Sequence, residues 1–290
     1  MRDFRFLTPE TLSEALAMLG DLGEDACVMA GGTALLLGMR QRMLSPESVV
    51  SLHRLEALKA IAFDPAHGLT IGALARHSDV ARSPDVQRHY PMLAEMAQRL
   101  ANPQIRNRAT IGGNLCYADP ATDPPTCLIA LDAEVTLAGP DGTRRLPMRD
   151  FSVDYFTTAL EPGEILTAIH LPPPDPARTG LYRRLLRTPA EHRPVASIAL
   201  TLRRDGEAVT GARVVIGAAT PAPQTMTRVQ AFLEGRHLSP DTATEAAALV
   251  AEEIAPLSDG RGDAAFRRRI ASVNTRRILL EIGGHDWRLE

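Results

Sequence analysis

The sequence predicts an α+β protein in which a two-part α/β domain is followed by a smaller domain of antiparallel sheet and helices. In the first half of the chain, short apolar strands alternate with amphipathic helices. A proline-rich segment follows Leu171, and beyond it three longer strands precede three helices. With 290 residues, of which 44% are hydrophobic, the chain can fill a large core and divide into two domains.

The first 55 residues predict a helix, a strand, a second helix and a second strand. Thr8 can cap the first helix with Pro9 at its first position, and apolar side chains then follow at helical spacing from Leu12. A buried strand over 26–30 leads through Gly31-Gly32 into a helix over 33–39. The strand over 48–52 is expected to lie parallel to the strand over 26–30.

The part from 56 to 174 predicts more strands and short helices. Its expected elements are strands over 59–63, 69–74 and 164–171, a helical region capped by Ser78 and interrupted by Pro84, a helix over 91–100, a short apolar element ending at Leu131 and a hairpin around Gly139-Pro140-Asp141-Gly142.

The run Pro172-Pro173-Pro174-Asp175-Pro176 predicts the domain boundary, because it can continue neither a helix nor a sheet. The expected domains are 1–174, with subdomains of about 1–55 and 56–174, and 178–290. The C-terminal domain is expected to hold strands at about 181–188, 195–203 and 212–219 and helices at about 226–234, 240–253 and 263–281. No internal repeat is evident.

The charge pattern argues against nucleic acids and membranes as partners. The formal net charge of −3 gives no global positive field, and the arginines at 267–269 and 276–277 are expected to form a solvated helix face or a subunit contact. The N-terminus lacks a signal peptide's apolar run, and no stretch approaches the length of a membrane span. We therefore expect a cytoplasmic protein.

The cysteines and histidines do not predict a metal site. Cys27, Cys116 and Cys127 are too few and too scattered for an iron–sulfur cluster, so any such cluster is expected on a partner. The histidines lack metal-ligand spacing, and His77 is expected to start a helix. Cys116 is expected to be a small buried thiol.

Two glycine turns about eighty residues apart carry the functional signal. The first is Ala30-Gly31-Gly32-Thr33 and the second is Thr110-Ile111-Gly112-Gly113-Asn114. Glycine lets backbone N–H groups approach a ligand closely, and the amides at a helix N-terminus suit a pyrophosphate. The two turns together indicate a bound dinucleotide. Arg106 and Arg108, just before the second turn, are expected to be solvated loop charges and are left out of the site.

With Asp123 nine residues after Asn114, these turns resemble the FAD-binding medium subunit of the molybdenum hydroxylases, the xanthine dehydrogenase and carbon monoxide dehydrogenase family. The resemblance covers nearly the whole chain. It implies a two-subdomain FAD-binding domain of the PCMH or VAO type, with non-covalent FAD between the subdomains, and a C-terminal domain of the carbon monoxide dehydrogenase flavoprotein type.

The resemblance also implies roles for individual residues. The first turn would wrap the pyrophosphate with backbone amides, the second would approach it from the other subdomain, and Asp123 would bond cofactor hydroxyls. Apolar side chains would line the cofactor, and Arg183 falls where xanthine dehydrogenases have a flavin-side lysine. The implied FAD-binding residues are Ala30, Gly31, Gly32, Thr33, Ala34, Leu35, Leu100, Thr110, Ile111, Gly112, Gly113, Asn114, Asp123, Ile165, Leu166 and Arg183.

The sequence departs from the family at two places. The stretch from Arg187 to Pro194 lacks the family's usual Asp after a basic residue, which leaves the residue flanking the flavin ring open. The four-cysteine insertion of some benzoyl-CoA-type reductases is also missing. Nor does the sequence contain a P-loop, a Gly-x-Gly-x-x-Gly fingerprint or a Ser/His/Asp set, so hydrolase, kinase and Rossmann-type functions have little support.

The function implied by the resemblance is electron transfer within an oxidoreductase. A large molybdenum-cofactor subunit would oxidise the substrate, a small subunit with 2Fe-2S clusters would relay electrons, and FAD here would pass them to a quinone, oxygen or NAD. No catalytic residue is required in this chain. A heterotrimer, often doubled to a heterohexamer, is expected. The alternatives are a stand-alone FAD-dependent oxidase and a non-redox binding or assembly module.

Overall fold

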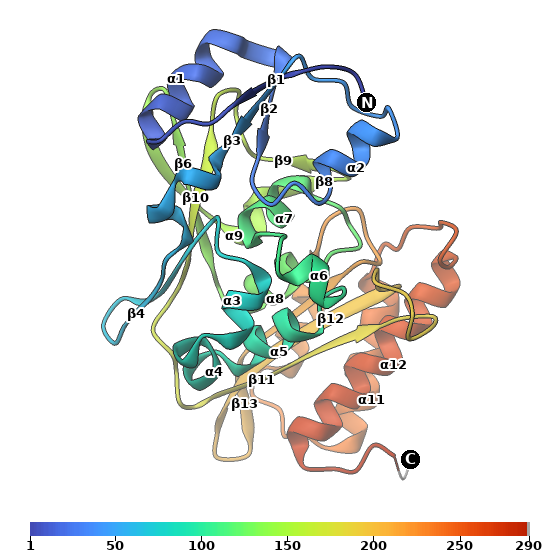
Figure 1. Ribbon diagram of the computed structural model, residues 1–290. Helices are drawn as coiled ribbons and strands as arrows, with labels where there is room; N and C mark the ends of the chain where they lie inside the picture. Colours follow the sequence, from blue (N-terminus) through green and yellow to red (C-terminus); the bar gives the residue numbers. More distant parts are fainter. Residues whose placement is uncertain (289–290) are drawn as a thin grey trace. The chain divides into compact units, whose positions relative to one another are not determined.

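The computed structural model describes residues 1–288, which divide into two compact units (Figure 1). The first unit contains Met1–Ala118, Ala133–Val153 and Thr157–Pro173. The second contains Asp119–Asp132, Asp154–Phe156 and the chain from Pro174 onward. Asp119–Asp132 therefore groups with the C-terminal half, although it precedes the proline segment. The predicted domain bounds stay a prediction, and residues 289–290 of the predicted C-terminal domain lie outside the described part.

The elements of the described chain alternate as the sequence predicts, and the α+β fold class is confirmed. The strands are β1 Arg5–Leu7, β2 Ala26–Met29, β3 Ser48–Ser51, β4 Ile61–Asp64, β5 Gly68–Gly72, β6 Glu134–Gly139, β7 Gly142–Pro147, β8 Ser152–Asp154, β9 Thr157–Thr158, β10 Ile165–Leu171, β11 Arg178–Leu185, β12 Ala196–Asp205, β13 Ala208–Gly217 and β14 Gln224–Thr225. The α-helices are α1 Leu12–Leu22, α2 Leu35–Arg40, α3 His77–Arg82, α4 Pro84–His89, α5 Pro91–Arg99, α6 Pro103–Arg106, α7 Ile111–Tyr117, α8 Pro124–Ala130, α9 Met148–Phe151, α10 Thr227–Leu233, α11 Pro240–Glu253 and α12 Ala264–Gly283.

The first unit contains two main sheets. One has the order β1-β3-β2, and its strands are parallel, which confirms the predicted direction of β3 relative to β2. Helix α1 packs on it through Ala15 and Leu19, which join a buried cluster with Val50 and Leu52. The other sheet is antiparallel with the order β4-β5-β10-β6-β7. The strand predicted over 164–171, which is β10, thus lies at the centre of this sheet.

Two predicted helix starts are wrong. Helix α1 is capped by Thr11 rather than Thr8, because the Thr11 hydroxyl accepts a bond from the Glu14 amide at 3.1 Å and Glu14 accepts one from the Glu10 amide at 2.7 Å. Ser78 lies inside α3, whereas Ser83 caps α4. Helix α3 instead begins after Arg76, whose amide donates to the Asp79 carboxylate at 3.2 Å.

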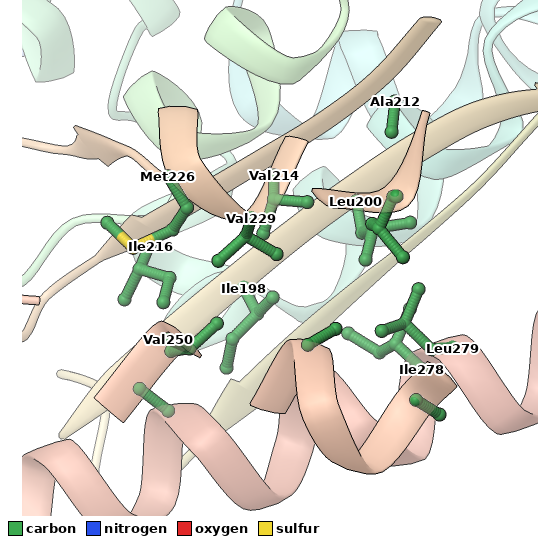
Figure 2. Packing of buried hydrophobic residues seen from close by; sticks show 14 of the residues in the cluster. Ile198, Leu200, Ala212, Val214, Ile216, Met226, Val229, Val250, Ile278 and Leu279 are labelled. Carbon is green, nitrogen blue, oxygen red and sulfur yellow. The ribbon is translucent and has the colours of Figure 1, made fainter. Parts of the chain in front are cut away.

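The second unit is built on the antiparallel sheet β11-β12-β13-β14. Ile198 and Leu200 of β12 and Val214 and Ile216 of β13 face a core that α10, α11 and α12 complete (Figure 2). The intervening residues of β12 point to the opposite face, where α8 packs on β12 and β13. There the hydroxyls of Thr126 and Ser197 are 3.2 Å apart. This packing explains why α8 groups with the second unit.

Candidate functional site

The first glycine turn leaves a run of backbone donors without partners. It connects β2 to α2, and Gly32 has a φ of +75°, a conformation that glycine adopts without strain. No atom of residues 1–288 accepts a hydrogen bond from the amides of Gly31, Gly32, Thr33 or Ala34. These residues are partly exposed. Consecutive free N–H groups at the entrance to a helix attract an anion, so this turn fits the diphosphate of a dinucleotide.

The second glycine turn is the first turn of a helix rather than an open loop. Thr110 caps α7, and its hydroxyl accepts a bond from the Gly113 amide at 3.1 Å. The other first-turn amides also donate within the protein: Ile111 to the Ala75 carbonyl at 2.9 Å, Gly112 to the Ala73 carbonyl at 2.9 Å and Asn114 to the Thr110 carbonyl at 3.0 Å. The two turns therefore differ: the first has four consecutive amides without an acceptor among residues 1–288, whereas the amides of Ile111 to Asn114 in the second are all bonded.

Gly31 and Gly112 lie where a side chain would clash with neighbouring backbone. A Cβ on Gly31 would lie 2.2 Å from the carbonyl oxygen of Arg108, and one on Gly113 would lie 3.4 Å from Cβ of Ala30. A Cβ on Gly112 would lie 2.5 Å from that of Ala73. The structure thus brings the two turns together within the first unit. Close contact inside the protein, and not only approach to a ligand, explains why these positions are glycine.

The three predicted apolar contacts are buried in the first unit. Leu100 directly follows α5, and its carbonyl oxygen accepts a bond from Arg106 at 2.8 Å. Ile165 belongs to the core cluster beneath α1, and Leu166 pairs with Leu137 across β10 and β6. Core packing accounts for each of these side chains, and a cofactor contact at them stays a prediction.

Asp123 lies in a buried polar cluster of the second unit. It directly precedes α8 and is only 2% exposed. Its Oδ1 accepts a hydrogen bond from the Tyr182 hydroxyl and lies 3.4 Å from Nε of Arg184. Burial raises the pKa of Asp123, while Arg184 and Tyr182 oppose that rise. The same burial and the neighbouring carboxylate hold the pKa of Tyr182 well above its usual range.

The residues of β11 alternate in direction, which separates Arg183 from Asp123. Tyr182 and Arg184 point to the Asp123 side of the sheet, whereas Arg183 points to the side of α12. Arg183 pairs there with Glu281, and its guanidinium lies 5.0 Å from the centre of the Trp287 ring. The cation beside Asp123 is therefore Arg184, which the sequence analysis did not select. Strict alternation counted from a buried Tyr182 is the signal that could have found it.

Two side chains outside the predicted site have unusual environments. His77 is fully buried, neither ring nitrogen has a partner, and burial together with Arg106 lowers its pKa to about 4. Cys116 is exposed as a residue rather than buried as expected, yet desolvation of its thiol raises the pKa to about 12. His77 is thus neutral, and Cys116 is a thiol rather than a reactive thiolate, at pH 7.

Residues 1–288 hold no group of three or more His, Cys, Asp or Glu side chains arranged to bind a metal ion. Within the same range, every helix is too short or too polar to cross a bilayer.

The comparison with known families decides which family this chain belongs to. Residues 2–174 match the model described as the FAD binding domain in molybdopterin dehydrogenase, and residues 175–282 match the CO dehydrogenase flavoprotein C-terminal domain. The chain is a member of this flavoprotein family. It is the FAD-binding medium subunit of a molybdenum hydroxylase, it belongs to an oxidoreductase complex, and FAD is its cofactor.

Individual relatives support the assignment over nearly the full length of each chain. The carbon monoxide dehydrogenase medium chain of Hydrogenophaga pseudoflava is 32% identical over 276 residues, which cover 95% of this chain and 96% of the relative. A putative xanthine dehydrogenase FAD-binding subunit of Escherichia coli is 28% identical over 273 residues, with 93% of each chain covered.

Solved structures agree with the sequence comparison. A carbon monoxide dehydrogenase chain from Hydrogenophaga pseudoflava superposes with a TM-score of 0.92 at 32% identity, with 96% of each chain covered. A chain of quinoline 2-oxidoreductase from Pseudomonas putida 86 gives a TM-score of 0.91 at 28% identity, with 98% of each chain covered. The resemblance inferred from the two turns and Asp123 is confirmed.

Proposed function

We propose that this medium subunit holds the diphosphate of FAD on the first glycine turn. The observation that supports the proposal most strongly is the run of unpaired amides from Gly31 to Ala34. These donors are partly exposed, and a diphosphate would offer them charged acceptors in place of water. Thr33 adds a hydroxyl, and Leu35 begins the helix that follows.

The second glycine turn positions the first in this proposal. The amides of Ile111 to Asn114 are already bonded, so this turn contributes backbone surface and the Asn114 side chain rather than a second run of free N–H donors. Gly112 and Gly113 allow the turn to pack on Ala73 and Ala30 without a Cβ. The turn thus keeps the first turn in the shape that exposes its donors.

Asp123 is a further cofactor contact in this proposal, and Arg184 lies beside it. The Asp123 carboxylate is oriented by Tyr182 and Arg184 and accepts hydrogen bonds from cofactor hydroxyls. Arg184 takes the role that the sequence analysis gave to Arg183, because it lies on the face that carries Asp123. Leu100, Ile165 and Leu166 supply apolar contact in this proposal.

Within the complex, this subunit transfers electrons to the external acceptor. Bound FAD supplies a carrier that accepts electrons singly and delivers them in pairs. The partners are a large subunit with the molybdenum cofactor and a small subunit with 2Fe-2S clusters, and the external acceptor is a quinone, oxygen or NAD. The chain's own residues bind and orient the cofactor, keep the Asp123 carboxylate in place and position a cation near it.

Absorption spectroscopy of the purified full chain tests this function. The expected spectrum shows flavin bands that bleach with dithionite, and acid releases intact FAD at one molecule per chain. A second test compares Arg184→Gln with the matched control Arg183→Gln. The proposal predicts weaker FAD binding for Arg184→Gln only, and equal binding by both variants would contradict the role given to Arg184.

A further inference from the structure

The side chain of Arg108, just before the second glycine turn, contacts the first glycine turn. Its Nε donates to the carbonyl oxygen of Gly31 at 3.2 Å, and its own carbonyl oxygen lies where a Cβ on Gly31 would be. Both residues belong to the first unit. This contact attaches the guanidinium to the turn that carries the four unpaired amides.

The surroundings of Arg108 contain donors but no anion. Within residues 1–288, no carboxylate pairs with Arg108, and the bond to Gly31 is the one hydrogen bond that its side chain makes. By contrast, Arg106 is occupied by the carbonyl oxygens of Leu100 and Ala101 at 2.8 and 3.2 Å. A fixed cation beside a row of free N–H groups concentrates positive potential at one point, which attracts a doubly charged group more strongly than the amides alone.

We propose that Arg108 binds the diphosphate of the cofactor together with the amides of the first glycine turn. This inference rests on the proposed function, and it assigns to the site a residue that the sequence analysis treated as a solvated charge. Nε holds the Gly31 carbonyl, and the two terminal nitrogens of the planar guanidinium donate to phosphate oxygens. Arg108 therefore recognises the diphosphate ester of the cofactor and does not contact the flavin ring.

A purely structural role is the competing explanation, and three substitutions separate it from phosphate binding. Arg108→Gln places an amide nitrogen at the same chain position as Nε, so it keeps a donor for Gly31 and loses the charge. Arg108→Lys keeps the charge and loses the Nε donor. Arg108→Met loses both. Arg88→Gln, at an exposed arginine of α4 in the same unit, is the matched control.

The experiment measures the dissociation constants of FAD, ADP and riboflavin for the full chain, at low and high salt, after far-UV circular dichroism has shown that each variant is folded. ADP reports the diphosphate without the flavin, and riboflavin reports the flavin without the diphosphate. For Arg108→Gln and Arg108→Met we expect FAD and ADP to bind roughly 10- to 100-fold more weakly, with riboflavin unchanged. Arg108→Lys should lose less than about tenfold.

The results that overturn the inference differ from those that overturn the proposed function. If Arg108→Gln binds FAD and ADP like the wild type while Arg108→Lys and Arg108→Met bind weakly, Arg108 only ties the turns together. If all three variants lose riboflavin and FAD equally, the effect is structural. A wild-type chain that takes up neither FAD nor ADP would instead refute the proposed function, and this inference with it.

Discussion

Replacing Gly31 with alanine tests whether contact between the two glycine turns shapes the cofactor site. The added methyl would lie 2.2 Å from the carbonyl oxygen of Arg108 and 2.9 Å from Cα of Ala109. Non-bonded heavy atoms normally approach no closer than about 3.5 Å, so the overlap exceeds ~1 Å and involves backbone that cannot rotate away. One of the two turns must therefore move.

The expected cost has two parts. Overpacking of this kind destabilises a folded protein by about 1–3 kcal/mol, which the free energy of unfolding in urea would report. Movement of the first turn also misaligns its free amides, and a loss of one charge-assisted hydrogen bond alone would weaken FAD binding roughly tenfold or more. Flavin fluorescence quenching during titration of the apoprotein measures that affinity.

Gly20→Ala provides the matched control. Gly20 lies in α1, and a Cβ there would meet no atom within 4 Å. Alanine in a helix should stabilise the protein by about 0.5–1 kcal/mol without changing FAD affinity. The reasoning is refuted if Gly31→Ala has the wild-type free energy of unfolding and the wild-type dissociation constant for FAD.

Three further predictions concern buried charges and the histidine. Folding lowers the pKa of His77 from 6.5 to about 4, so the free energy of unfolding is highest above pH 6.5 and falls by about 3 kcal/mol as the pH drops to 4. His77→Gln should remove that part of the loss, measured by urea titrations at several pH values. An unchanged pH profile would contradict this prediction. Arg267 is buried and donates to the carbonyl oxygens of Val195 and Ala218, so Arg267→Met should lower the free energy of unfolding by about 3 kcal/mol. Arg268 is exposed, and Arg268→Met should change the free energy of unfolding by less than about 0.5 kcal/mol. Equal effects of the two substitutions would show that the buried bonds contribute little. Arg184→Gln leaves the buried Asp123 carboxyl without its cation and should lower the free energy of unfolding by about 3 kcal/mol. Arg183→Gln should lower it by less than about 1 kcal/mol. The reverse order in thermal or urea unfolding would contradict the assignment of the faces of β11.

The sequence predicted the elements whose hydrophobic pattern is long and regular. The strands that became β12 and β13 and the helices α11 and α12 lie within a few residues of their expected bounds. Starts of short helices were less predictable, because Thr8 and Thr11 both look like caps and only the bond from the Glu14 amide distinguishes them. The sequence alone therefore could not show which of the two threonine hydroxyls caps α1.

The candidate site was predictable in position more than in mechanism. Sequence pattern alone located both glycine turns, and the structure brings them together. It could not reveal that the amides of Ile111 and Gly112 are bonded internally, since their partners Ala75 and Ala73 lie far away in sequence. The choice between Arg183 and Arg184 depends on a one-residue register in β11, which reverses the face that each side chain occupies.

The visible spectrum of the purified chain, followed by mass identification of the acid-released chromophore, tests the central claim most directly. We expect flavin absorption that bleaches on reduction and FAD released intact, with one molecule per chain. A colourless chain that takes up no added FAD would contradict the assignment of the unpaired amides of Gly31 to Ala34 to a diphosphate.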